Sequence, residues 1–188
     1  MGMYQHMKEN FIQEYKERSL PYKERLVKWN AEPPIVRVEK PTNIARAREI
    51  GYKAKPGILV ARVAVIGGKK KRVVPGGGRK PSKNARYFSR QKSTQAIAEE
   101  RAAKKFTNCE ILNSYFVGEI GSKKFYEIIM LERNNPSLIN DSNYKKIIAQ
   151  KNRVFRGLTY TGRVRRGIAR KGFGTKHNRP SKRANNRS

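Results

Sequence analysis

The segment Ile58-Leu59-Val60-Ala61-Arg62-Val63-Ala64-Val65-Ile66 contains a single polar side chain, Arg62, and predicts a buried β-strand. Alternate residues of a strand point to opposite faces of its sheet. The face that carries Leu59 and Val63 is wholly apolar, whereas Arg62 interrupts the other face. A strand buried on one face and partly covered on the other is typical of the centre of a small sheet. We therefore expect the fold to be built around this strand.

Two further strands and a helix are expected to complete the core. Residues 109–117 and 124–132 have strand-like patterns and are joined through residues 118–123, which predicts a hairpin. A helix is expected over residues 93–106. The expected fold class is α+β, with a small, mostly antiparallel sheet packed with helices, a long basic loop and an extended basic C-terminal tail.

An apolar stripe predicts a helix at the start of the chain. Its members recur at spacings of three and four, which places them on one face, and we expect that face to pack on the protein body. The stripe consists of Tyr4, Met7, Phe11 and Tyr15.

Two more helices are expected before the strand. One begins near Ser19 and ends at the Pro33-Pro34 pair, because proline cannot continue a helix. Its apolar face consists of Tyr22, Leu26 and Trp29. The other is a short helix that begins at a Thr42 cap and reaches Ile50, with Gly51 as a left-handed stop.

The charge of the chain is concentrated in two segments that contain no acidic residue. The 188 residues include 44 Lys and Arg against 14 Asp and Glu, a formal net charge of +30. Thirteen of the bases lie between Glu49 and Glu99, and fifteen lie after Asp141, the only aspartate. A folded surface normally mixes both signs, because like charges repel one another. The two acid-free segments therefore indicate binding to a dense polyanion, and nucleic acid is the commonest one.

Glycine and proline punctuate both basic segments. Residues 67–92 hold two glycine-rich runs, so we expect a long basic loop without a regular element. Glycines alternate with arginines after Arg153, which lets backbone N–H and guanidinium groups reach phosphate together. The aromatic residues among them either stack on unpaired bases or anchor the tail to its own domain. They are Phe155, Tyr160 and Phe173.

Apolar patterning divides the chain by role. Folding is expected to reside in residues 1–66 and 93–133, because the tail from Asn134 shows little periodicity and mostly loop chemistry. With 37% hydrophobic residues, the core must be small. The expected divisions are an N-terminal helical segment (1–50), an α+β core with the basic loop (51–133) and a basic nucleic-acid-binding extension (134–188).

The sequence offers little support for catalysis, metal binding or membrane insertion. Glu99 and Glu100 are adjacent, so on a helix they diverge by about 100° and cannot share a metal or a proton. His6 and His177 lie at opposite ends of the chain. Cys109, the only cysteine, is expected to be a buried strand thiol in a reducing compartment. No phosphate-binding glycine motif and no membrane-spanning apolar run occurs. We expect a non-enzymatic protein without cofactor, metal or small-molecule substrate.

Four passages, in order along the chain, resemble the archaeal and eukaryotic large-subunit ribosomal protein L15e family. In that family the central strand usually ends in alternating arginines, where this chain has Ala64-Val65-Ile66 before Gly67-Gly68. The chain stops at Ser188, shorter than eukaryotic members, so we expect an archaeal type. The passages are Met1–Tyr4; Ala45–Gly57; Ala98–Arg101 leading into Leu112–Glu119 and Lys124–Ile128; and Arg156–Thr159 with Gly162-Arg163 and Arg166-Gly167.

The resemblance implies a structural constituent of the large subunit in the cytoplasmic ribosome. It implies binding to 23S-type rRNA beside neighbouring ribosomal proteins, with no membrane contact. Together with the acid-free segments, it gives a set of bases expected to contact rRNA. They are Arg46, Arg48, Lys53, Lys55, Lys69, Lys70, Lys71, Arg72, Arg79, Lys80, Lys83, Arg86, Arg90, Lys92, Arg153, Arg156, Arg163, Arg165, Arg166, Arg170, Lys171, Lys176, Arg179, Lys182 and Arg183.

Two rival functions are weaker. A DNA-compacting architectural protein is also small and basic, but such proteins use symmetric wedges or arms. The irregular glycine-rich loop and tail fit the varied surface of folded RNA better. A membrane-surface protein needs a basic amphipathic helix or a lipid motif, and the sequence shows neither.

Overall fold

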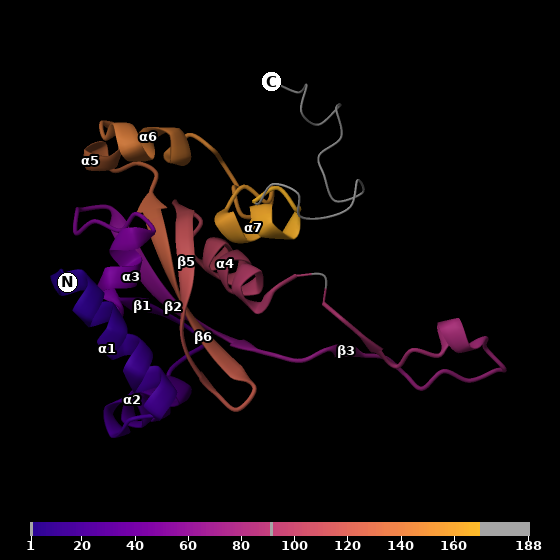
Figure 1. Cartoon of the computed structure of the whole chain (residues 1–188). Helices are drawn as coiled ribbons and strands as arrows, with labels where there is room; N and C mark the ends of the chain where they lie inside the picture. The colour runs from indigo at the N-terminus through magenta and orange to yellow at the C-terminus, as the bar shows by residue number, and fades with distance from the viewer. Residues whose placement is uncertain (1, 91, 170–188) are drawn as a thin grey trace.

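The computed structural model describes residues 2–90 and 92–169. Its core is a four-stranded antiparallel sheet in the order β1-β2-β6-β5. The strands are β1 (Ile35–Val38), β2 (Ile58–Ile66), β5 (Cys109–Ile120) and β6 (Lys123–Glu132). Helices lie on both sides of this sheet (Figure 1). The α+β class and the small antiparallel sheet predicted from the sequence are confirmed.

β2 lies inside the sheet, and apolar contacts cover both of its faces. The face with Ala61 and Val63 packs against α4 (Thr94–Lys105). The opposite face contributes Ala64 to a second cluster that includes residues of α2 (Leu20–Ala31). The predicted central strand and the predicted helix over residues 93–106 are therefore both confirmed.

The three expected N-terminal helices are present, and one of them packs differently from the prediction. They are α1 (Met3–Glu17), α2 and α3 (Ile44–Glu49). The predicted apolar face of α2 is buried. In α1, Phe11 and Tyr15 pack against the core, whereas Tyr4 and Met7 are exposed. The apolar stripe thus joins the buried core only over its C-terminal half.

Two details around α3 differ from the sequence prediction. Asn43, not Thr42, caps the helix, and its side chain accepts a hydrogen bond from the Arg46 N–H at 2.9 Å. Thr42 donates instead to the buried Glu127 carboxylate, which is a charged and therefore stronger acceptor. β1 was not predicted, because four residues are too few to show a convincing alternation.

The hairpin is longer than predicted and has a tighter turn. Both strands continue to the Gly121–Ser122 connection, so Gly118 lies within β5. A Cβ atom at Gly118 would lie 3.0 Å from the Tyr22 Oη atom and 3.0 Å from a Leu26 methyl carbon. Gly118 therefore allows α2 to approach the sheet, and it is not a turn residue.

The described part of the tail includes three short helices that the sequence analysis did not predict. It contains α5 (Pro136–Ile139), α6 (Ser142–Ile148) and α7 (Tyr160–Arg165). Leu138, Tyr144 and Ile148 are buried in the same cluster as the apolar face of α2. These helices were missed because each has fewer than eight residues, which is too short for a periodic pattern.

Residues 67–90, which we call the basic arm, extend away from the body of the protein (Figure 1). They were expected to lack regular structure, but β3 (Lys70–Lys71) pairs with β4 (Tyr87–Phe88), and Pro81–Lys83 form a 3₁₀ turn. Arg72 supports this ribbon by donating to the carbonyls of Ala85 and Lys83, each at 3.0 Å. A side chain thus adds hydrogen bonds to a ribbon whose strands pair over only two residues each.

Candidate nucleic-acid interface

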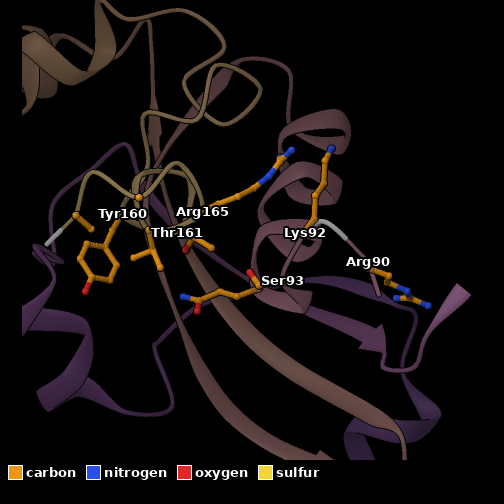
Figure 2. Close-up of a pocket in the computed structure, with 10 residues that line it drawn as sticks. Arg90, Lys92, Ser93, Tyr160, Thr161 and Arg165 are labelled. Carbon is orange, nitrogen blue, oxygen red and sulfur yellow. The ribbon is translucent and has the colours of Figure 1, made fainter. Parts of the chain in front are cut away.

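The two acid-free segments of the sequence meet in space at the beginning of α4. The basic arm leads into α4 through Arg90 and Lys92, and α7 packs beside the same helix. Between them lies a cavity of about 630 Å³, which we call the α4–α7 cleft. Figure 2 shows Tyr160 and Thr161 on one side of it and Ser93 on another. The described residues that line it are Arg90, Lys92, Ser93, Gln95, Tyr160, Thr161, Val164, Arg165, Gly167 and Ala169.

A buried carboxylate fixes the position of α7. The Glu99 side chain on α4 is only 1% exposed and accepts hydrogen bonds from Thr159 at 2.8 Å and Thr161 at 2.9 Å. It also accepts from the Ser114 hydroxyl of β5. Burial raises the pKa of Glu99, and the three hydroxyl donors partly offset that rise. Glu99 therefore ties the beginning of α7 to both the helix and the sheet.

The neighbouring acid, Glu100, has a different role. Its carboxylate receives both hydrogen bonds of the Lys92 ammonium group, at 2.6 and 2.8 Å. Glu99 and Glu100 therefore diverge as predicted and do not form an acid pair. Among the described residues, no group of three or more His, Cys, Asp and Glu side chains is arranged to hold a metal ion.

Nine of the predicted contact residues are exposed and have no hydrogen-bond or ion-pair partner for their side chains within residues 2–90 and 92–169. Their charges therefore face solvent uncompensated, as a polyanion-binding surface requires. Six lie on the basic arm and three on α7 or at its end. They are Lys69, Lys71, Arg79, Lys80, Lys83, Arg86, Arg163, Arg165 and Arg166.

Other predicted contact residues already have intramolecular partners. Exposed ion pairs join Arg46 to Glu49 at 2.5 Å and Lys55 to Asp141 at 2.7 Å. The remaining partners are aromatic rings or carbonyl oxygens. Three cations lie over aromatic rings: Arg48 over Tyr4, Lys53 over Tyr144 and Arg72 over Phe88. Two arginines donate to carbonyl oxygens: Arg90 to Ile66 and Arg156 to Lys151.

Arg153 points into the protein and not toward a partner. It donates to the Ile111 carbonyl at 2.7 Å and to the Gln150 side chain at 3.2 Å. Burial lowers the pKa of its guanidinium group. Arg153 therefore joins the segment before α7 to β5. The predicted contacts Arg170, Lys171, Lys176, Arg179, Lys182 and Arg183, and the aromatic Phe173, lie outside the described residues, as does the side chain of Lys70.

Among the described residues that line the cleft, sequence reasoning named the bases Arg90, Lys92 and Arg165 but missed the neutral residues that shape it. Ser93, Gln95 and Val164 carry no charge or motif that marks them. Tyr160 was recognised only as an aromatic residue among bases, with two possible roles. In the structure it is 57% exposed, so it does not anchor the tail by burial.

The sequence predicted a buried strand thiol at Cys109, and the structure confirms it. Cys109 is buried at the beginning of β5, and burial raises the pKa of its thiol, as expected of a structural cysteine. In the described part of the chain, no helix is long and apolar enough to span a bilayer.

Fold and surface together define a small, strongly basic α+β protein with a projecting basic arm and a basic cleft. The family model described as Ribosomal L15 matches residues 2–185. The chain belongs to this ribosomal protein family, L15e.

Two archaeal relatives agree with this assignment. "Large ribosomal subunit protein eL15" of Nanoarchaeum equitans is 43% identical over 187 residues, which cover 98% of each chain. The protein of the same name from Methanocorpusculum labreanum is 45% identical over 159 residues, 84% of this chain and 82% of the relative.

Proposed function

We propose that this protein is a structural constituent of the large ribosomal subunit that binds and stabilises folded 23S-type rRNA. The observation that carries the proposal is the meeting of the two acid-free segments at the α4–α7 cleft. Two stretches far apart in sequence thereby form one basic surface. Family membership supports a non-enzymatic role in the cytoplasmic ribosome.

Each part of the surface contributes differently to binding. The basic arm presents exposed lysines and arginines at a distance from the core, where they reach phosphates of an irregular RNA surface. α7 and its C-cap residue add three exposed arginines on a backbone segment that the Glu99 contacts hold in place. These cations release condensed counterions from RNA, and the ordered backbone lowers the conformational entropy that must be lost on binding.

The N-terminal segment is proposed to face neighbouring ribosomal proteins. Residues 1–50 contain seven of the fourteen acids, so this part of the surface is poorly suited to phosphate. Helix α1 also leaves Tyr4 and Met7 exposed. Mixed charge with exposed apolar side chains is typical of protein–protein contacts and not of phosphate contacts.

Association with the subunit tests this function. The tagged protein, expressed in its own cells, should sediment with the large subunit and stay there after a high-salt wash. A matched measurement compares binding to a large-subunit rRNA fragment and to duplex DNA of equal length at moderate salt. Clear preference for rRNA is expected, because folded RNA offers 2′-hydroxyls, groove shape and unstacked bases. Release in the wash together with equal affinity for DNA would favour an architectural DNA-binding protein.

A further inference from the structure

We propose that the α4–α7 cleft is a pocket for a single unstacked nucleotide of the rRNA, with its base on the Tyr160 ring and its phosphate at Arg165. The inference rests on the proposed rRNA-binding function and adds a defined subsite to it. Elsewhere on the surface, exposed cations are suited to contact the outside of a folded RNA. The cleft is suited to bind an unstacked base.

The size of the cleft supports this choice of ligand. Its volume of about 630 Å³ lies within the range of about 300–1,000 Å³ that is usual for pockets binding small molecules. A duplex presents its phosphates on a convex surface, and contacts to them require no hollow. Single-stranded loops and bulges, in contrast, offer bases that can be splayed into a protein pocket.

Tyr160 provides the stacking surface. Its side chain is 57% exposed, and its ring has no aromatic or cationic neighbour among the described residues. Tyr160 is the first residue of α7, between the two threonines that bind Glu99. The backbone at Tyr160 is therefore held on both sides along the chain, and its exposed ring projects from a fixed position. The exposed side chain of Val164, one turn later, adds an apolar surface beside it.

Polar groups in the cleft match a base edge. The Gln95 amide is oriented by two hydrogen bonds from its Nε2 atom, to the Ser114 carbonyl at 3.0 Å and the Ser114 hydroxyl at 2.9 Å. Its Oε1 atom accepts no hydrogen bond within the described residues, so it can accept from an amino or imino group of a base. Ser93 lines the same cavity, and its Oγ atom already accepts from the Ala96 N–H, which leaves its hydroxyl proton to donate.

The charges at the rim match the phosphate. Arg165 is exposed and unpaired within the described part of the chain. Lys92 is held by Glu100, and Arg90 by the Ile66 carbonyl. The cleft thus presents three cations and a single neighbouring carboxylate to a nucleotide with one negative charge. Positive charge together with an exposed aromatic ring is the combination that binds unpaired nucleotides.

Four variants of the full chain test the pocket by binding to its own large-subunit rRNA. Tyr160→Ala should weaken binding by about ten- to a hundredfold, because one stacked base is lost. Tyr160→Phe keeps the ring and should bind as the wild type does. Arg165→Gln should lower the slope of log K against log salt by about 0.7–0.9, whereas Tyr160→Ala should leave the slope unchanged. Val27→Ala removes an exposed apolar side chain from α2 and serves as the control; it should have no effect on binding to the rRNA.

The outcomes distinguish a failure of the pocket proposal from a failure of the proposed rRNA-binding function. If the wild type binds rRNA tightly and Tyr160→Ala binds equally well, the pocket proposal is wrong while rRNA binding stands. If the wild type shows no preference for rRNA over duplex DNA, the proposed rRNA-binding function is wrong, and the pocket proposal that rests on it is wrong as well. Ultraviolet cross-linking of assembled subunits should attach a nucleotide at Tyr160. A peptide of another ribosomal protein attached there would show that a protein segment occupies the cleft, and the nucleotide would be ruled out.

Discussion

Gly162 lies so close to Gly157 that a Cβ atom on Gly162 would stand 2.6 Å from the Gly157 Cα atom. Gly157 itself has a φ of 67°, a conformation that favours glycine. The two glycines let the segment before α7 fold back against the helix. This contact and the bonds to Glu99 place Tyr160 and Arg165 at the cleft.

We expect Gly162→Ala to disturb this contact. A methyl group has no room beside the Gly157 backbone, so the substitution should lower the free energy of unfolding by about 1–3 kcal/mol. Urea denaturation measures this. Gly76→Ala is the control, because a Cβ atom at Gly76 meets nothing within 4 Å and should leave the free energy nearly unchanged. Equal stability of the two variants would contradict the close approach.

Truncation tests where the folded core ends. A chain ending at residue 133 lacks Leu138, Tyr144 and Ile148, each at most 9% exposed. Burial of such side chains contributes about 1.5–3 kcal/mol each, and whole domains are stable by only about 5–15 kcal/mol. We therefore expect this chain to lose its cooperative thermal transition and a chain ending at residue 169 to keep it. A cooperative transition for the shorter chain would restore the boundary predicted from the sequence.

The pKa of Glu99 makes part of the stability depend on pH. Burial raises that pKa above its ordinary value of 4.5, so the folded state holds the proton more tightly than the unfolded state. The stabilisation is fully present below pH 4.5 and is lost as the pH rises through the folded pKa. The difference between the free energies of unfolding of the wild type and of Glu99→Gln should therefore decrease as the pH rises from 4 to 8. A constant difference would show that Glu99 has the same pKa in both states.

Arg72 and its lysine neighbours are expected to behave differently when substituted. Arg72→Gln removes the bonds to Ala85 and Lys83, so hydrogen exchange in the basic arm of the free protein should become faster. Replacing Lys69 and Lys71 by Gln should leave exchange unchanged, because neither side chain has a partner in the described part of the chain. The double lysine variant should instead weaken rRNA binding and lower its salt slope by about 0.7–0.9 per charge. Unchanged exchange in Arg72→Gln would mean that the arm does not depend on this side chain.

The sequence predicted the elements whose patterns are long and missed those whose patterns are short. β2 and α4 have nine and twelve residues, enough for an alternation or a helical period to be visible. α5 has four residues, and its burial depends on Leu138 meeting residues of α2 far away in sequence. No local pattern contains that information.

The candidate interface was predictable as a charge distribution but not as a shape. The absence of acids marked the arm and the tail as basic segments. It could not separate Arg153, which is turned inward, from Arg165, which is exposed, because both lie in the same arginine–glycine pattern. Nor could it place Gln95 beside Tyr160, because the cleft forms only when α4 and α7 pack together.

The salt dependence of rRNA binding tests the central claim most directly. If the two acid-free segments act as one surface, at least about ten phosphates should be neutralised at once. A plot of log K against log salt for the wild-type protein and its own large-subunit rRNA should then have a slope of roughly −7 to −9. A slope near −2 would show that most of the positive charge contacts no phosphate, and it would contradict the account.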